Sequence, residues 1–270
     1  CCGLFGLKAQ RDRIATAPLG DIWNGLGVYG FLTRSVADSA LLYEVATGRP
    51  YVAAARREPG RLRVALSLKI PPGVAARLGS EQRRATHETA ELLRSLGHEV
   101  IERNPSYGLI GRNVMVRYVA GANIEAQTMA HPARMEPRTR GMVRMGAAVK
   151  PLLRRAIAAQ DADARRINRI FEDVDVVLTP TLSCGPLPIG RYDGCGALQT
   201  FNGAAGFVAF NPLFNHIGNP AAAIPAGFDG DGLPLSAQLG AAPDGEETLL
   251  SLAAQLEAAR PWGARRPPIS

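Results

Sequence analysis

The sequence has few cysteines, and their spacing excludes two common roles. The four cysteines, Cys1, Cys2, Cys184 and Cys195, fit neither a zinc knuckle nor a C-x-x-C redox pair. Structural disulfides belong to oxidising compartments, so this usage predicts reduced thiols and a cytoplasmic protein. The opening run Cys1–Lys8 is typical of the interior of a packed domain, and we expect further polypeptide to precede it.

The composition argues against nucleic acid and membrane as partners, and neither is expected. Only three of the basic residues are lysine, aromatic residues make up 6% of the chain, and the arginines are scattered singly and in pairs. A nucleic-acid interface needs basic residues gathered on one face, preferably with aromatics for stacking. No stretch approaches 18 uninterrupted apolar residues, so a transmembrane helix is not predicted.

Motifs for cofactors and metals are incomplete. Gly25–Gly30 spells G-x-G-x-x-G, but Pro, Asp and Asn interrupt the stretch before it, where a dinucleotide fold needs an apolar strand. Asp229–Gly232 lacks the ligand alternation of a calcium loop, and His87–Glu91 lacks the second histidine of a zinc protease helix. We therefore expect no cofactor and no metal.

Nucleophile motifs are also incomplete. The closest match to a G-x-S-x-G elbow, residues 181–185, lacks the first glycine, and His216 is expected to be structural. One alternative stays open, because an N-terminal Cys1 can act as a nucleophile with its own amine as the base. Such enzymes begin on a strand, which Cys1-Cys2-Gly3 does not resemble.

Hydrophobic periodicity predicts an α/β protein folded as one layered domain over residues 1–270. Residues 1–30 are expected to form a loop over the core. Residues 62–102 predict a β-α-β unit, hence parallel strands joined by a right-handed crossover. The remaining pattern predicts helices at 33–47 and 246–259, a mostly helical stretch over 107–172, a strand at 174–181 and a hairpin around 229–232.

Segments along the whole chain resemble the amidase signature family. Cys1–Lys8 resembles C-G-L-x-G-L-K-P, with Ala9 in place of the usual proline. Further matches, in family order, are residues 30–42 (G-P-x-x-R-T-V-x-D-A-A-L-L, with Phe31 and Ser35 as departures), 175–181 (D-V-L-L-T-P-T), 210–239 (F-N-x-x-G-x-P-A and a hairpin) and 252–262 (the closing helix).

The resemblance implies α/β/α layers around a mixed β-sheet and carboxamide hydrolysis by a Ser-cisSer-Lys group, without a cofactor. In the family, that lysine and both serines precede the C-G-L-x-G-L-K stretch, so they would lie before Cys1. Lys8, Lys69 and Lys150 fall outside the catalytic motifs. We therefore expect the C-terminal portion of an amidase fold, incomplete on its N-terminal side, with no catalytic residue in this chain.

The resemblance implies that this chain still forms one wall of the substrate pocket. The candidate pocket residues are Trp23, Tyr29, Phe210 and Asn215. Core packing is the alternative for each. The complete enzyme is expected to act on a small carboxamide. This chain is then one half of a split amidase completed in trans, or a non-catalytic binding relic. Missing strands are also expected to expose a sheet edge and an apolar face under residues 1–8, which favours a homodimer.

Overall fold

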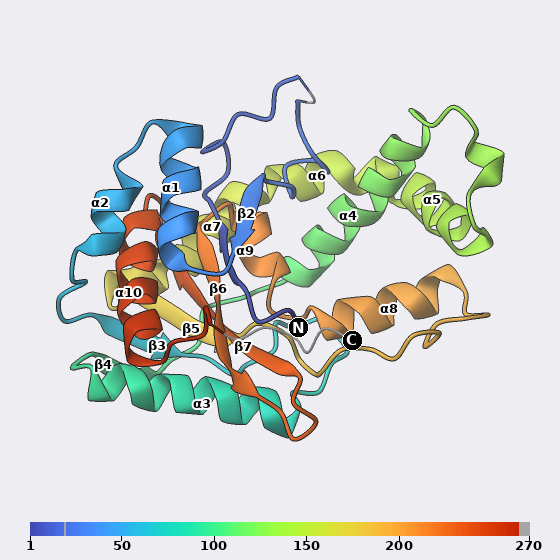
Figure 1. Ribbon diagram of the computed structural model, residues 1–270. Helices are drawn as coiled ribbons and strands as arrows, with labels where there is room; N and C mark the ends of the chain where they lie inside the picture. Colours follow the sequence, from blue (N-terminus) through green and yellow to red (C-terminus); the bar gives the residue numbers. More distant parts are fainter. Residues whose placement is uncertain (19, 265–270) are drawn as a thin grey trace.

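A computed structural model describes residues 1–18 and 20–264. In this part of the chain seven strands form one sheet with the order β2-β1-β6-β7-β5-β3-β4 (Figure 1). The strands are β1 (Phe5–Lys8), β2 (Gly30–Thr33), β3 (Arg63–Leu66), β4 (Glu99–Glu102), β5 (Val176–Pro180), β6 (Ala221–Phe228) and β7 (Pro234–Ala241).

The sheet is mixed, as expected for the α/β class. Strands β3, β4 and β5 pair in parallel, and all other neighbours pair antiparallel. The predicted β-α-β unit is confirmed as β3, helix α3 (Ser80–Ser95) and β4. The predicted hairpin joins β6 and β7, where the Asp229 side chain accepts hydrogen bonds from the backbone N–H groups of Asp231 and Leu233.

Helices cover both faces of the sheet (Figure 1). One core cluster joins the sheet to α1, α2, α3 and α10, while α4, α7 and α9 pack on the opposite face, and α5, α6 and α8 flank them. Besides α3, the helices are α1 (Val36–Thr47), α2 (Tyr51–Arg56), α4 (Ile110–Ala126), α5 (Pro137–Val149), α6 (Leu153–Ala158), α7 (Gln160–Asn168), α8 (Ala197–Phe207), α9 (Pro212–Ile217) and α10 (Glu246–Ala259).

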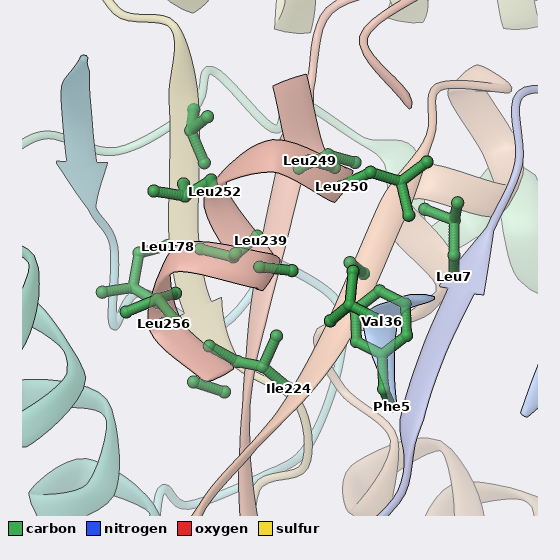
Figure 2. Close-up of a cluster of buried hydrophobic side chains, with 14 of the residues drawn as sticks. Phe5, Leu7, Val36, Leu178, Ile224, Leu239, Leu249, Leu250, Leu252 and Leu256 are labelled. Carbon is green, nitrogen blue, oxygen red and sulfur yellow. The ribbon is translucent and has the colours of Figure 1, made fainter. Parts of the chain in front are cut away.

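The main core follows strand alternation. Successive side chains of a strand point to opposite faces. In β5, Leu178 packs with Leu239 and the leucines of α10 (Figure 2), whereas Val177 packs in a separate cluster on the other face. The N-terminal strand contributes Phe5 and Leu7 to the same core as α10 (Figure 2).

The expectation of a loop over residues 1–30 was wrong at both ends. Strand β1 lies inside the sheet, paired with β2 on one side and β6 on the other. Glycines in these strands interrupt the alternation of apolar and polar side chains by which a strand is predicted. They occupy positions where a neighbouring side chain or backbone comes too close for a Cβ atom. A Cβ on Gly30 would lie 2.7 Å from Tyr43 Oη and 2.9 Å from the Leu7 carbonyl oxygen.

The sheet edge is therefore one strand further out than expected. Because β1 is paired on both sides, the edge on this side is β2, where the Leu32 side chain is 73% exposed. The neighbouring helix α1 also presents apolar side chains to solvent, with Leu41 54% and Val45 79% exposed. Apolar side chains exposed together on a helix and a neighbouring sheet edge are typical of a surface that another chain covers.

Candidate functional site

A cleft of about 330 Å³ opens on the sheet face opposite α1 and α10. Its floor is built from small residues on neighbouring strands, with Gly6 of β1 in register with Ala223 of β6, and Ala221 one pleat away. Since none of these positions carries a side chain beyond a methyl group, the space above the sheet stays open. The small residues at these three positions thus leave room for the cleft, and Lys8, in register with Ala221, is the long side chain on the same face of β1.

Polar side chains line the walls of this cleft. Gln238 of β7 donates from Nε2 to Thr179 Oγ1 (3.1 Å) and to the Phe210 carbonyl oxygen (3.4 Å). Thr181 Oγ1 and Asn211 Oδ1 also belong to lining residues and are buried, yet neither has a hydrogen-bond partner within the described residues. Buried polar atoms are almost always hydrogen-bonded, so these two oxygens leave hydrogen-bonding capacity at the cleft.

Lys8 lies at the same cleft. Burial lowers its pKa to about 7, and the positive charge of Arg11 lowers the pKa in the same direction. Its Nζ donates to the Ala9 carbonyl oxygen at 2.9 Å. Across residues 1–18 and 20–264, no lysine is hydrogen-bonded to a serine hydroxyl. The Lys8 amine therefore gains or loses its proton close to neutral pH, and it is hydrogen-bonded to a backbone carbonyl oxygen and not to a serine hydroxyl.

Two of the four predicted pocket residues lie at the cleft. Tyr29 is 40% exposed beside the edge strand, and Asn215 lies on α9. The Asn215 Nδ2 group donates to the Leu26 carbonyl oxygen at 2.8 Å. Asn215 therefore ties the loop that carries Tyr29 to the wall of the cleft.

The other two predicted pocket residues lie elsewhere. Trp23 has a positive φ of 54° and packs its ring 4.9 Å from that of Tyr118, over Gly121 of α4. Phe210 is only 2% exposed and does not line the cleft; its carbonyl oxygen accepts a hydrogen bond from Gln238, which does. The structure thus brings Tyr29 and Asn215 together and sets Trp23 and Phe210 apart.

A second hollow lies on the other side of the segment that leads into α9. It is an apolar cavity of about 560 Å³ between α4, α8 and the loop 71–75. Along residues 208–215 the lining alternates: Val208, Pro212 and Leu213 face the apolar cavity, whereas Asn211 and Asn215 face the cleft. The two hollows therefore share one wall.

A row of buried polar side chains, joined by hydrogen bonds, connects α9, which follows that wall, to α4 and α7. Arg117 of α4, 1% exposed, donates to His216 Nδ1 at 3.1 Å, and His216 Nε2 lies 2.9 Å from Asp163 Oδ2 of α7. Because an arginine only donates, Nδ1 must accept, so His216 is the neutral tautomer with its proton on Nε2. Burial lowers the pKa of His216, more than the Asp163 carboxylate raises it.

The Asp163 carboxylate completes this row. It also accepts from Asn113 Nδ2 at 2.7 Å and pairs with Arg166. Burial alone raises the pKa of Asp163, but hydrogen bonds from Asn113, His216 and Arg166 outweigh that effect and hold it below the usual range. His216 thus has a structural position, which fits the sequence-based expectation for it.

The residues that sequence reasoning missed are Thr181, Asn211 and Gln238. All three stand inside segments that carry the family resemblance, so those segments were the available signal. Asp163 and Arg117 lie in helices with no motif around them, and nothing in the sequence marked them.

The remaining candidate motifs have the following positions in the fold. Within residues 1–18 and 20–264, no group of three or more His, Cys, Asp and Glu side chains is placed to hold a metal ion. Gly25–Gly30 forms a turn that leads into β2, instead of following a strand. Cys1 and Cys2 are exposed and not disulfide-bonded. No helix in the described ranges has the length and hydrophobicity to cross a membrane.

Comparison with protein families gives one match, to the family described as Amidase, over residues 1–250. A relative from Mycobacterium tuberculosis named "Putative amidase AmiB2" is 46% identical over 276 residues, covering 100% of this chain and 60% of the relative. "Putative amidase AmiA2" from the same species is 36% identical, covering 98% of this chain and 58% of the relative. The chain spans about 60% of the length of the curated relatives it matches.

Solved structures agree in fold. The structure of 6-aminohexanoate cyclic dimer hydrolase is 29% identical, with a TM-score of 0.87 over 99% of this chain and 62% of that one. The same hydrolase complexed with substrate gives a TM-score of 0.86. A bacterial aryl acylamidase of the amidase signature family, 19% identical with a TM-score of 0.73, supports the fold alone.

Proposed function

The chain belongs to the amidase family, and from this premise we propose that it forms part of a carboxamide hydrolase that works by acyl transfer to serine. In this proposal the catalytic lysine and both serines come from a completing polypeptide outside these 270 residues. The chain itself supplies most of the sheet, the cleft and the apolar cavity. No cofactor takes part.

The observation that carries the proposal is the pair of orphaned polar atoms in the cleft. Thr181 Oγ1 and Asn211 Oδ1 are buried without a partner. Leaving such an atom unsatisfied costs about 1–3 kcal/mol, so a bound group that pairs with both atoms gains part of that free energy. A carboxamide substrate or the backbone of the completing polypeptide offers the N–H and C=O groups they lack.

The chemistry of the proposed reaction explains what each part does. A neutral lysine takes the proton of the bridging serine, which in turn takes the proton of the nucleophilic serine. The serine oxygen bonds to the amide carbonyl carbon, backbone N–H groups hold the tetrahedral oxyanion, and the C–N bond breaks as the amine leaves with the relayed proton. Water then cleaves the acyl ester and restores the serine. Gln238 and Asn211 are the residues of this chain proposed to orient the amide.

Lys8 is not the base in this scheme. Its Nζ donates to the carbonyl oxygen of the adjacent residue, Ala9, and a base needs a serine hydroxyl within hydrogen-bond reach. A small or medium carboxamide is the proposed substrate. A relative from Pseudomonas sp. named 6-aminohexanoate-cyclic-dimer hydrolase, 30% identical, supports an amide substrate.

The exposed apolar surface at the sheet edge favours completion by association. Leu32 on β2 and Leu41 and Val45 on α1 are each more than half exposed. Apolar groups gathered at an unpaired strand are typical of an interface. We propose that the completing polypeptide covers this edge, and that a homodimer forms through it when that polypeptide is absent.

The test is a hydrolysis assay with the purified 270-residue chain, alone and mixed with the part of AmiB2 that this chain does not cover. Hexanamide and benzamide are the substrates, and ammonia release is measured. We expect activity only in the mixture, abolished when the nucleophilic serine of the added part is changed to alanine.

Two other outcomes contradict the proposal in different ways. Activity of the chain alone, lost in Cys1→Ala, would assign the reaction to an N-terminal nucleophile. A stable, folded complex that binds amides but releases no ammonia would make the protein a non-catalytic binding relic. Sedimentation of the mixture distinguishes that second outcome from a failure to associate.

A further inference from the structure

We propose that a third hollow, bordered by residues 10–28 and by helices α4, α6 and α7, binds a small aliphatic carboxylate through Arg11 and Arg117. No step of the proposed reaction depends on this site. It is defined by two neighbouring arginines that have no negatively charged partner in the described residues.

The two guanidinium groups lie side by side. A Cβ on Gly25 would lie 2.7 Å from Arg117 Nη2 and 3.6 Å from Arg11 Nε, so the width of one glycine separates them. Arg117 is 1% exposed, and both side chains line the third hollow. Two positive charges this close repel each other, and burial strengthens the repulsion because little water screens it. Burial, followed by the charge of Arg11, lowers the pKa of Arg117 to about 10.

Neither arginine is neutralised within the described part of the chain. Arg11 donates only to backbone carbonyl oxygens, among them those of Asn215 (2.6 Å) and His216 (3.0 Å). Arg117 donates to the Asn24 carbonyl oxygen at 3.0 Å and to His216 Nδ1 at 3.1 Å. All of these acceptors are uncharged. Buried charges are normally paired with an opposite charge, so this pair favours a bound anion.

Both guanidinium groups keep N–H donors for such an anion. The Nη1 group of Arg11 has no hydrogen-bond partner in the described residues. Of the five N–H donors of an arginine, Arg117 directs those on Nε and one on Nη2 to Asn24, and one on Nη1 to His216. One donor on each Nη nitrogen is left. A carboxylate accepts from two arginine nitrogens at once, and such charge-assisted hydrogen bonds are about twice as strong as neutral ones.

The size and the remaining lining of the third hollow indicate the rest of the ligand. Its volume is about 440 Å³, within the range of roughly 300–1,000 Å³ for small-molecule sites. Four aliphatic side chains belong to the lining, Ile14, Ile22, Val28 and Ile157. A ligand that carries a short hydrocarbon part beside its charged group matches both kinds of lining.

Two exposed carboxylates limit the charge of the ligand. Asp12 and Asp21 line the third hollow as well, but both are exposed, and Asp21 accepts a hydrogen bond from the backbone N–H of Gly25. Their negative charges repel a doubly charged ligand more strongly than a singly charged one. A monocarboxylate therefore fits this site better than a phosphate dianion.

The third hollow lies away from the edge at which the completing polypeptide is proposed to bind. It borders α4 and α7, which pack on the face of the sheet opposite α1 (Figure 1). The exposed apolar side chains proposed for that contact lie on β2 and α1. We therefore assign the site to a free ligand and not to a side chain of the completing polypeptide.

The experiment is calorimetric titration of the 270-residue chain with butyrate, 1-nitropropane and inorganic phosphate at pH 7.5 and low chloride. Butyrate and 1-nitropropane have nearly the same shape, but only butyrate is charged. Butyrate is expected to bind at least about tenfold more tightly than 1-nitropropane, and to bind more weakly as sodium chloride is added. Equal affinity for these two compounds, or tighter binding of phosphate than of butyrate, would overturn the proposal.

A variant that supplies its own carboxylate locates the site. Gln160 is the first residue of α7 and lines the third hollow. Gln160→Glu is expected to lower butyrate affinity by at least about tenfold, because the new charge takes the place of the ligand. Ala162→Glu is the control, since Ala162 lies in the same helical turn but is exposed and does not line the hollow. Wild-type butyrate affinity in Gln160→Glu would refute the assignment.

Thermal melts add a readout that does not depend on titration. Gln160→Glu should melt at a higher temperature than Ala162→Glu, because only the first places a negative charge beside the two arginines. If Gln160→Glu does not fold, Ile157→Trp decides the matter. Ile157 lies on α6, lines the hollow and is 40% exposed, so a larger side chain there is tolerated and should weaken butyrate binding about fivefold. Unchanged binding would again refute the assignment.

The completed protein distinguishes a free carboxylate from a side chain of the completing polypeptide. Butyrate is expected to bind the mixture of the chain and that polypeptide as it binds the chain alone. Complete loss of butyrate binding in the mixture would mean that the polypeptide fills the site, and would overturn the proposal. Because binding is measured without turnover, a failure to hydrolyse amides removes only the proposed function.

Discussion

Mild acid is expected to destabilise this protein in part through His216. His216 is fully buried, accepts a hydrogen bond from Arg117 on Nδ1 and faces Asp163 with Nε2. Protonation of Nδ1 would place a second donor opposite the guanidinium, so the folded state binds this proton only weakly. Burial, the main cause, and the charges of Arg117 and Arg11 all lower the pKa of His216.

The sign and size of the effect follow from proton linkage. The unfolded chain protonates His216 with the ordinary pKa of about 6.5, whereas the folded pKa is lower. The stability that this group contributes is therefore complete above about pH 6.5 and is lost as the pH falls below it. Between pH 7.5 and 5.5 the loss is at most about 1.4 kcal/mol, reached when folded His216 stays neutral throughout.

The assay is thermal unfolding followed by circular dichroism at pH 7.5 and 5.5. For a domain of this size about 1.4 kcal/mol corresponds to a melting temperature lower by about 3–5 °C. His216→Gln keeps an amide acceptor and donor but cannot titrate, so it should lower stability at both pH values and show a smaller pH effect. The control His131→Gln alters an exposed histidine and should retain the full effect.

Equal pH effects in the wild type and His216→Gln would refute this reasoning. That result would mean that His216 is already charged in the folded protein or that the chain from Arg117 to Asp163 does not form. The Asp163 carboxylate does not confuse the comparison, because its pKa is held below the usual range and it titrates well below pH 5.5.

Three further predictions concern the sheet and the cleft. Gly240→Ala is expected to lower the free energy of unfolding by about 1–3 kcal/mol, because the added Cβ would overlap the Phe214 ring. The control Gly230→Ala has open space around the added Cβ and should be near neutral. Thermal melts compare the two variants. Lys8→Met is expected to raise the melting temperature at pH 6 more than at pH 9. The folded pKa of Lys8, about 7, lies below its ordinary value, so the destabilisation from its charge is complete below about pH 7 and is relieved as the pH rises toward the unfolded pKa. Equal gains at both pH values would contradict this. Thr181→Val should leave the stability of the chain alone unchanged or slightly higher, because the hydroxyl it removes has no partner. It should weaken binding of the completing polypeptide or of amides, as measured by calorimetry. A large loss of stability would mean that the hydroxyl has a partner.

Elements with strong local patterns were predictable from the sequence. The β-α-β unit, the hairpin and the last helix are all present. These features depend on neighbours a few residues apart, and side-chain period and backbone restriction suffice to specify them.

Strands β1 and β2 were not predictable in the same way. Each has only four residues, and glycine occupies Gly6 and Gly30, so no alternation of apolar and polar residues is visible. Their place in the sheet depends on pairing with β6, more than two hundred residues away from β1, and on close approach to Tyr43. Such partners leave no trace in a local window.

The sequence by itself determined the α/β class, the order of most elements and, through motifs spread along the chain, the family. Only the tertiary structure decided which polar groups meet. Arg117, His216 and Asp163 come from three helices and form one chain of hydrogen bonds. Thr181 and Asn211 become notable only because burial leaves their oxygens without partners. Burial and hydrogen bonding depend on everything packed around an atom, and only the folded chain supplies those neighbours.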